Sequence, residues 1–337
     1  MKKLKIGVIG AGRIGKVHAA TLVQNVPQAE VLAIADIDLA GASELAQKFG
    51  ISKVSTNYKD IINDPEIEAV VICSPTDTHA QYIIEAAQAG KHIFCEKPVD
   101  LTLAAIQKAL EAVEKAGVKL MVGFNRRFDP NFMKIHEMVK EGKIGQPHIL
   151  KITSRDPAPP PAEYSAVSGG MFLDMTIHDF DMARYIADSE VTEVYTKATV
   201  LVDPEIGKAG DVDTAIITLT FANGAIGVID NSRKAVYGYD QRVEIFGSLG
   251  MVNVDNNYPE NHRYYTVDGV HKTLPLNFFM ERYLEAYTNE MKVFCDAVAN
   301  DTELPVSGYD GLMSVAIALA AKKSYLEGRS VKMSEIL

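Results

Sequence analysis

Basic residues are in the minority in this chain of 337 amino acids. The sequence holds 34 lysine and arginine residues against 44 aspartate and glutamate residues, which gives a formal net charge of −10. Proteins that bind nucleic acid or an anionic membrane surface present an excess of positive charge, because phosphate groups dominate those partners. We therefore expect neither nucleic acid nor a membrane among the partners of this protein.

Cysteine is also scarce, and the three cysteines, Cys73, Cys95 and Cys295, lie far apart. An odd number of distant cysteines forms neither a disulfide framework nor a Cys-x-x-Cys metal site, and free thiols suit a reducing compartment. Long apolar runs are missing as well. The run at 315–321 is far shorter than the roughly 20 residues that span a bilayer. We expect a soluble, cytoplasmic protein without a bound metal.

The first 123 residues alternate between short apolar runs and segments with helical spacing. The apolar runs are rich in Val and Ile and indicate buried parallel strands, whereas most of the intervening segments end at a glycine, as helices commonly do. This alternation is typical of a doubly wound parallel sheet, the α/β arrangement of a Rossmann domain. The predicted strands are 5–9, 31–35, 69–73, 92–95 and 119–122.

The pattern changes to β-like runs and a few helices beyond residue 123. Thr214–Phe221 alternates apolar and polar residues, as expected for an antiparallel sheet with one buried face. A single helix is predicted over 170–186. The chain is too long for one ordinary core. The sequence predicts a Rossmann domain over 1–123 and an α+β domain with a large, mainly antiparallel open sheet over 124–337.

A glycine-rich segment, GAGRIG at residues 10–15, follows the first predicted strand and opens the first predicted helix. Its glycines permit a tight turn, close approach of a pyrophosphate and close packing of helix on strand, while the helix N-terminus attracts phosphate. Asp36 ends the second strand, where a carboxylate hydrogen-bonds ribose hydroxyls and repels a 2′-phosphate. These features predict a dinucleotide site that prefers NAD. Arg13 leaves NADP open as a weaker substitute, and a glycine-rich turn without a ligand is the alternative explanation.

Further residues are predicted at this cofactor site because they follow strands of the parallel sheet, whose carboxyl ends gather ligands. The segment Ser74-Pro75-Thr76 follows the strand at 69–73, and Glu96-Lys97-Pro98 ends the strand at 92–95. The predicted cofactor-binding residues are Gly10, Gly12, Arg13, Ile14, Gly15, Asp36, Ser74, Thr76, His79, Glu96 and Lys97.

Two segments of the chain contain candidates for chemistry. Lys97 is held between a strand and a proline, so it is better fixed than a surface lysine, although a solvated lysine is an equally good explanation. Asp174 and His178 are four residues apart, with Asp181 three further on, so a helix places all three on one face. A carboxylate beside an imidazole raises its basicity and suits a general base that removes a proton from an alcohol. The alternative is a solvated acidic helix face.

Together these residues resemble a known family. The GAGRIG segment, Asp36, Glu96-Lys97-Pro98 and the Asp174/His178 pair follow one another in the order seen in the Gfo/Idh/MocA oxidoreductases, and the resemblance covers essentially the whole chain. Within the family, the runs 154–161, 168–184 and 236–242 are similar to bacterial inositol 2-dehydrogenases. The resemblance implies NAD-dependent oxidation of a cyclic polyol, with myo-inositol converted to 2-keto-myo-inositol (scyllo-inosose).

The resemblance also implies roles for individual residues. His178 is expected to accept the hydroxyl proton, Lys97 to hydrogen-bond the reacting oxygen, and Asp174 to bind substrate and set the protonation of both. These three are the predicted catalytic residues. The predicted substrate-binding residues are Lys97, Arg126, Asp156, Asp174, His178 and Tyr237.

Several functions stay open. Another inositol isomer or a pyranose sugar is an alternative substrate, and an NAD-dependent glycosidase or a non-catalytic cofactor-binding regulator has the same fold. Arg126 has a second explanation as an interdomain salt bridge. The second domain is expected to bind substrate and to form the interfaces of a homo-tetramer, as the sheets of this family do.

Overall fold

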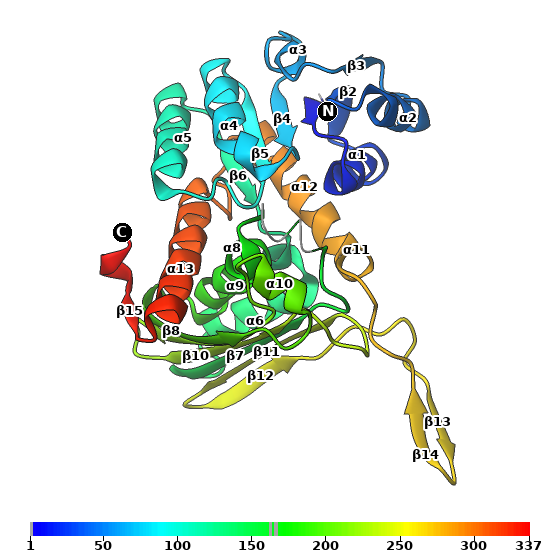
Figure 1. Cartoon of the computed structure of the whole chain (residues 1–337). Coiled ribbons are helices and arrows are strands. Elements are labelled where there is room, and N and C mark those ends of the chain that lie inside the picture. The colour runs from blue at the N-terminus through cyan, green and yellow to red at the C-terminus, as the bar shows by residue number, and fades with distance from the viewer. Residues whose placement is uncertain (1–2, 162–163, 165–167) are drawn as a thin grey trace. The chain divides into compact units, whose positions relative to one another are not determined.

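The computed structural model describes residues 3–161, 164 and 168–337 and divides the chain into two compact units (Figure 1). Unit 1 comprises Met1–Phe128 and Glu285–Val315, and unit 2 comprises Asp129–Leu284 and Ala316–Leu337. The expected domains, 1–123 and 124–337, differ from these units mainly in the segment Glu285–Val315. That segment joins unit 1 because helix α12 (Leu284–Asn300) packs there, with the Phe294 ring 5.9 Å from the Phe94 ring.

Unit 1 is built on a six-stranded sheet in the order β3-β2-β1-β4-β5-β6, and every neighbouring pair is parallel. This order is that of a dinucleotide-binding Rossmann sheet, so the doubly wound sheet is confirmed. The strand β3, only three residues long, was not predicted because it has no apolar run of its own. The strands are β1 (Leu4–Ile9), β2 (Ala29–Ala35), β3 (Lys53–Ser55), β4 (Ala69–Ile72), β5 (His92–Glu96) and β6 (Leu120–Gly123).

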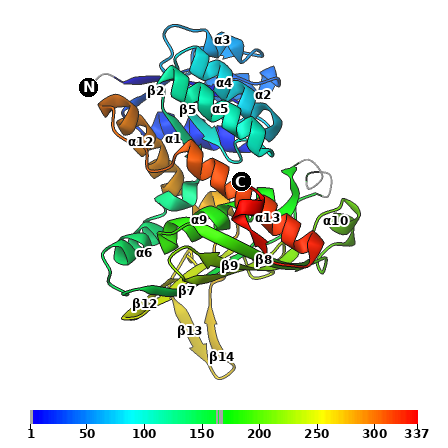
Figure 2. The same cartoon turned by 90° about the vertical axis from the view of Figure 1, so that its left-hand side faces the viewer.

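Helices connect these strands and shield the sheet. In α2 and α5, a side chain caps the N-terminus, and Gly50 and Gly117 end the helices in the left-handed conformation, as the sequence predicted. Helices α4 and α5 pack against each other, as Figure 2 shows. The helices are α1 (Arg13–Asn25), α2 (Leu39–Phe49), α3 (Lys59–Ile62), α4 (His79–Gln88) and α5 (Leu103–Ala116), with 3-10 turns η1 (Thr76–Thr78) and η2 (Asn125–Phe128).

Unit 2 contains a seven-stranded sheet in the order β12-β11-β7-β10-β9-β8-β15. All neighbouring pairs are antiparallel except β7 and β10, which run parallel. The large, mainly antiparallel sheet is therefore confirmed. The strands are β7 (Pro147–Arg155), β8 (Val191–Thr199), β9 (Thr214–Phe221), β10 (Ile226–Ser232), β11 (Asp240–Gly247), β12 (Gly250–Val254) and β15 (Val331–Lys332).

Helices cover one face of this sheet. Helix α9 (Ile177–Ala187) contacts β7, and α6 (Pro130–Lys140) contacts α9. On the other face, Figures 1 and 2 show no helix among the residues that the structure describes. Burial along β9 alternates strictly from Ala215 to Phe221, as expected for a sheet with one covered face. The remaining helices are α8 (Gly170–Asp174), α10 (Pro204–Lys208), α11 (Phe279–Arg282), α13 (Gly308–Glu327) and the 3-10 turn η3 (Met333–Glu335).

The predicted helix over 170–186 is wrong in one respect, because the chain forms two helices, α8 and α9, with a break at Met175 and Thr176. The N–H of Thr176 donates to the carbonyl of Met171, five residues back, which widens the turn. Its hydroxyl donates to Asn231 Oδ1 at 2.7 Å, a bond to the neighbouring sheet. The apolar pattern continues through the break, so the break could not be predicted from the sequence.

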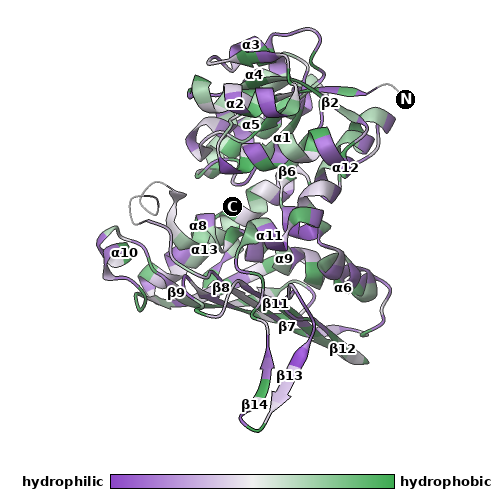
Figure 3. Ribbon diagram, turned by 90° about the vertical axis from the view of Figure 1, so that its right-hand side faces the viewer, coloured by the Kyte–Doolittle hydropathy of each residue, from purple (hydrophilic) through white to green (hydrophobic). Residues whose placement is uncertain are grey.

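A two-stranded hairpin, β13 (Arg263–Thr266) and β14 (Gly269–Lys272), projects from the seven-stranded sheet. Figure 3 shows mixed hydropathy along it. The three cysteines are free and buried. Within the described residues, none of the helices combines the length and the apolar character needed to cross a membrane.

Candidate functional site

The glycine-rich loop joins β1 to α1, and each glycine has a separate steric reason. Gly10 has φ +100°, and a Cβ there would lie 2.6 Å from the carbonyl carbon of Cys73. A Cβ on Gly15 would lie 1.9 Å from the carbonyl oxygen of Gly10, so this glycine permits helix and loop to touch. Around Gly12, by contrast, no atom of the described chain lies within 4 Å of such a Cβ. Gly12 therefore leaves open space beside the loop.

That open space lies where the first turn of α1 begins. Gly12 is the N-cap of α1, and in the described structure no side chain accepts a hydrogen bond from the first turn. A helix N-terminus without such a cap offers its N–H groups and its positive dipole end to an anion. The first turn carries no acidic residue, and Arg13 is exposed there. The loop thus fits a pyrophosphate.

Asp36 directly follows β2 and turns toward the loop. Its Oδ2 accepts a hydrogen bond from the N–H of Ala11 at 2.5 Å, and its Oδ1 accepts one from the N–H of Asp38 at 2.8 Å. The next residue, Ile37, is 93% exposed. An apolar side chain so exposed beside a nucleotide loop offers a surface for an adenine ring, and the sequence analysis missed it. The sequence Asp-Ile-Asp at the end of the strand could have indicated this exposed position, because it places Ile37 between two acidic residues.

The turn after β4 carries Ser74, Thr76 and His79. Ser74 Oγ lies 2.6 Å from Thr78 Oγ1. Both ring nitrogens of His79 face backbone carbonyls, with Nδ1 2.8 Å from Pro98 O and Nε2 2.8 Å from Ser74 O. Burial lowers the pKa of His79. His79 therefore ties this turn to the turn after β5 and offers no ring nitrogen to a cofactor.

Lys97 and Arg126 follow neighbouring strands at the carboxyl edge of the sheet. Lys97 comes after β5, is half-buried and forms a cis peptide bond with Pro98. Arg126 lies in η2 after β6 and is 5% exposed. Glu96, the last residue of β5, turns inward instead, with Oε1 2.6 Å from His18 Nε2. The structure therefore places Lys97 at the edge where cofactors bind and Glu96 beneath it.

In unit 2, Asp174 and His178 stand out by their exposure. Within residues 170–184, all of which the structure describes, every residue is buried except these two, which are half-buried. Asp181, predicted on the same helix face, is 1% exposed. Asp174 and His178 are therefore the polar positions by which this otherwise buried segment reaches the surface of unit 2.

A buried arginine that the sequence analysis missed holds two of the predicted residues. Arg233 is 3% exposed, and its guanidinium donates to Asp156 Oδ2 at 3.1 Å and to Asp174 Oδ2 at 3.2 Å. Burial lowers the pKa of Arg233, but the charges of Asp174 and Asp156 outweigh that effect and raise it. Arg233 therefore stays charged and links the two carboxylates. The sequence offers no signal for Arg233, because its position follows from the parallel pairing of β7 and β10, which the sequence does not reveal.

Tyr237 belongs to a neighbouring ionic cluster. Its hydroxyl donates to Asp240 Oδ2 at 2.6 Å and accepts a hydrogen bond from Arg155 Nη1 at 3.1 Å. Arg155 also pairs with Asp230. The single hydroxyl proton of Tyr237 is thus engaged within the protein, so toward a ligand this oxygen acts as an acceptor.

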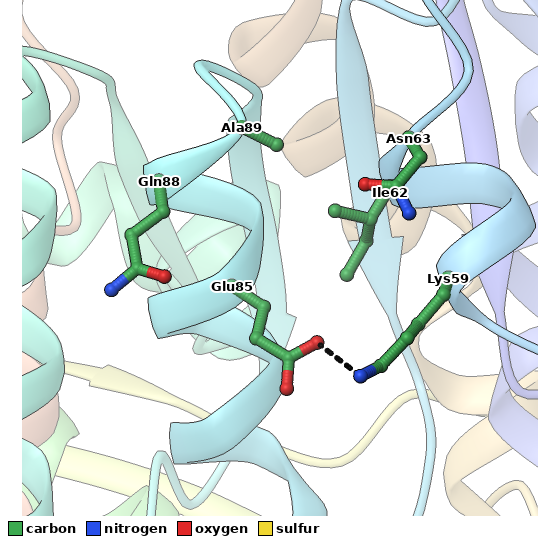
Figure 4. Close-up of a pocket in the computed structure, with 6 residues that line it drawn as sticks. All are labelled: Lys59, Ile62, Asn63, Glu85, Gln88 and Ala89. Carbon is green, nitrogen blue, oxygen red and sulfur yellow. Dashed lines mark ion pairs between the residues drawn. The ribbon is translucent and has the colours of Figure 1, made fainter.

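One hollow of about 310 Å³ lies elsewhere in unit 1, between α3 and the C-terminal end of α4 (Figure 4). Lys59 and Glu85 form an ion pair across it, with Nζ 3.8 Å from Oε2. Because α4 starts at the carboxyl edge of the sheet and runs back, its C-terminal end lies at the opposite edge from the glycine loop. This hollow is therefore separate from the candidate cofactor site.

Comparisons with known proteins agree with this arrangement. The model of the Gfo/Idh/MocA oxidoreductase family with an NAD-binding Rossmann fold matches residues 4–124, and the model of the Gfo/Idh/MocA C-terminal domain matches residues 132–253. The chain is 52% identical over 332 residues to an uncharacterized oxidoreductase of Bacillus subtilis, YrbE, with 98% of this chain and 97% of that protein covered.

Two further relatives have named activities. The chain is 51% identical over 334 residues to the myo-inositol 2-dehydrogenase of Thermotoga maritima, with 99% of this chain and 100% of that protein covered. The structure matches that of scyllo-inositol dehydrogenase from Lactobacillus casei with bound cofactor NAD(H) and scyllo-inositol at a TM-score of 0.93 and 29% identity. That match covers 99% of this chain and 100% of the other.

Proposed function

Because this chain belongs to the Gfo/Idh/MocA family of oxidoreductases, we propose that it oxidises a cyclic polyol with NAD, converting myo-inositol to 2-keto-myo-inositol. The observation that carries this proposal is the pair Asp174 and His178, half-buried in an otherwise buried segment and backed by Arg233. The full-length similarity to a myo-inositol 2-dehydrogenase supports the substrate.

NAD fits the residues of unit 1. The glycines at 10, 12 and 15 and the free first turn of α1 suit its pyrophosphate, and the carboxylate of Asp36 suits its adenosine ribose. When bound, its nicotinamide supplies the hydride acceptor of the reaction. The negative charge of Asp36 disfavours a 2′-phosphate, so we propose NAD as the main cofactor and NADP as a weaker substitute.

The proposed chemistry assigns one task to each polar residue. His178 accepts the proton of the substrate hydroxyl as a general base. Lys97 hydrogen-bonds the reacting oxygen and stabilises the negative charge that develops on it. Asp174 hydrogen-bonds the substrate, and Arg233 orients its carboxylate.

Three more residues are proposed to bind the other hydroxyls of the ring, namely Arg126, Asp156 and Tyr237. Because Tyr237 donates its proton to Asp240, we assign it the role of an acceptor toward a substrate hydroxyl. A cyclic polyol offers a hydroxyl on every carbon, and a binding site gains selectivity when each of its buried polar groups finds a partner. A site with this many charged side chains suits a polyol better than an apolar alcohol.

The test is NADH formation by the purified protein with NAD and a panel of myo-inositol, scyllo-inositol, D-chiro-inositol, glucose and xylose. We expect the highest kcat/KM with myo-inositol. His178→Ala is expected to lower kcat about 100-fold or more, because it removes a general base, while NAD still binds. The control His262→Ala, with a 63% exposed side chain, is expected to match the unchanged protein.

Other outcomes would redirect the assignment. A preference for scyllo-inositol or glucose would keep the reaction and change the substrate. Release of an aglycone from a glycoside without NADH accumulation would indicate an NAD-dependent glycosidase. NAD binding without turnover of any compound would contradict the dehydrogenase and favour a non-catalytic regulator. The cytoplasmic location and the homo-tetramer stay predictions.

A further inference from the structure

Three ionisable side chains to which the proposed reaction assigns no role meet in the interior of unit 1. They are His18 on α1, Glu96 at the end of β5 and Glu290 on α12. His18 and Glu290 are 0% exposed and Glu96 is 9% exposed. One atom from each lies within 4.8 Å of the other two. Two carboxyl groups therefore share a site from which water is largely excluded.

The two carboxyl groups of this cluster differ in what they contact. Glu96 Oε1 lies 2.6 Å from His18 Nε2, so this carboxyl group has a hydrogen-bond partner. Glu290 has no hydrogen-bond partner for either carboxyl oxygen among the described residues. Two ionised carboxylates this close repel strongly in a buried site, so the pair holds at most one negative charge. The proton therefore belongs to Glu290.

Among the described residues, the imidazole ring of the cluster is hydrogen-bonded through Nε2 alone. Among the described residues, His18 Nδ1 has no hydrogen-bond partner. The ring packs against Phe94 at 5.1 Å and Tyr287 at 5.6 Å, which exclude water. A proton on Nδ1 would be buried without an acceptor, so Nε2 is the nitrogen that donates to Glu96.

This cluster connects the segments that carry the proposed site. Helix α1 begins at the glycine loop, Glu96 immediately precedes Lys97, and Glu96 pairs in register with Gly123, after which the chain leads to Arg126. A Cβ on Gly123 would lie 3.1 Å from the Glu96 carboxyl group. Glu96 therefore adjoins three segments: α1, the Lys97 turn and the segment that leads from Gly123 to Arg126. A change in its charge or position is expected to affect all three.

We propose that Glu290 is a positioning residue, a neutral carboxylic acid that packs beside the His18–Glu96 pair without adding a second charge and so leaves Glu96, and with it the Lys97 turn, in place. Glu290 touches neither substrate nor cofactor in this proposal. The consequence for Lys97 rests on the proposed dehydrogenase function, whereas the protonated state of Glu290 does not.

The proposal has a defined pH dependence. Burial, and then the charge of Glu96, raises the pKa of Glu290 well above its ordinary value. The other titratable groups around this cluster are Tyr287, which packs against His18, and Cys73 and Cys95, and burial raises the pKa of both thiols. Above the ordinary pKa of glutamate the folded chain keeps a proton that the unfolded chain has released. The contribution of Glu290 to stability is thus full at acidic pH and is lost as the pH rises.

The experiment compares Glu290→Gln, Glu290→Leu and the control Glu285→Gln, which changes an exposed residue of the same helix. We expect the infrared band of a protonated carboxylic acid at pH 7 in the unchanged protein and in Glu285→Gln, and its loss in Glu290→Gln. Glu290→Gln retains the size and the neutrality of the acid, so its kcat stays within about twofold, whereas Glu290→Leu lowers kcat about tenfold because its shorter, branched side chain fills the space beside Glu96 differently. With rising pH, Glu290→Gln gains stability relative to the unchanged protein.

Failure of this proposal is distinguishable from failure of the proposed function. Absence of the infrared band, or one divalent metal ion per chain that Glu290→Gln removes, would overturn the neutral acid whatever the substrate is. If the unchanged protein shows the band but Glu290→Leu has the same kcat as the unchanged protein, the positioning role is overturned. A band in a protein that oxidises none of the polyols would instead contradict only the dehydrogenase.

Discussion

Burial at the scale of single residues separates the side chains that face the candidate site from those that support it. Asp174 and His178 are half-buried, whereas Arg233 is 3% exposed and holds Asp174 from beneath. In unit 1, Glu96 belongs to the supporting residues because it points inward, whereas the next residue, Lys97, lies at the sheet edge. A motif can contain residues that face the site beside residues that support it, as Lys97 and Glu96 show, and only the exposure of the side chains distinguishes them.

Asp36 allows a test of cofactor preference at this scale. Asp36→Asn keeps an acceptor for the N–H of Ala11 but removes the negative charge that disfavours a 2′-phosphate. We expect the ratio of kcat/KM with NADP to that with NAD to rise about tenfold. Glu30→Gln, an exposed change of equal charge on the same strand, is the control and leaves the ratio unchanged. An unchanged ratio in Asp36→Asn would argue that Asp36 only shapes the loop.

The start of α8 shows how an element depends on a distant residue. Gly170 has φ +76°, and both carboxylate oxygens of Asp211 accept from the N–H of Met171 at 3.0 Å. A Cβ on Gly170 would lie 2.5 Å from Asp211 Oδ1. The double glycine at 169–170 thus permits a carboxylate from far along the chain to cap the helix that carries Asp174.

Gly170→Ala tests this cap. The control is Gly210→Ala, which has a similar φ of +80° but no atom of the described chain within 4 Å of the new Cβ. We expect Gly210→Ala to lower the free energy of unfolding by about 1–2 kcal/mol, the cost of a left-handed alanine. Gly170→Ala is expected to cost about 1 kcal/mol more because it also displaces the cap. Denaturant titration measures both, and equal losses would show that Asp211 moves aside freely.

A second consequence at the scale of elements is the parallel pairing of β7 with β10, in which Arg155 lies opposite Ser232. Both strands end at the same edge of the sheet, so the next residues, Asp156 and Arg233, meet there. An antiparallel pair would have placed these residues at opposite edges. The ion pair therefore follows from strand direction, a property of the sheet and not of either segment.

At the scale of the whole molecule, the face of the unit 2 sheet that none of the described helices covers carries a row of apolar side chains across four strands. Ile149 lies opposite both Ile226 and Phe246, and Phe246 lies opposite Met251. Their exposed fractions are 37%, 54%, 44% and 51%. A contiguous exposed apolar row on a sheet is typical of a subunit interface, which supports the proposed homo-tetramer.

Phe246→Glu tests that interface, because it buries a charge if two copies associate through this face. We expect sedimentation to show smaller assemblies than the unchanged protein forms at equal concentration. Leu326→Glu, at a 70% exposed position on α13, is the control and is expected to leave the assembly intact. An unchanged assembly in Phe246→Glu would place the interface on another surface.

The sequence by itself determined the parts of the protein that follow from local physics. The Val- and Ile-rich runs predicted the parallel strands, and the glycines of residues 10–15 predicted the turn that steric contact with Cys73 and Gly10 now explains. The spacing of Asp174 and His178 identified a polar pair. Each of these depends on backbone sterics or on periodicity over a few residues, and the printed sequence contains both.

The tertiary structure decided everything that depends on which distant segments pack together. It placed α12 in unit 1 and so brought Glu290 to Glu96, it paired β7 with β10 and so brought Arg233 to Asp156, and it broke the predicted helix at Thr176. An amphipathic pattern shows that a helix has a buried face but not which core that face joins. The burial of a charged side chain, likewise, can be predicted only when its partner is known, because the interaction with the partner offsets the free energy of removing the charge from water.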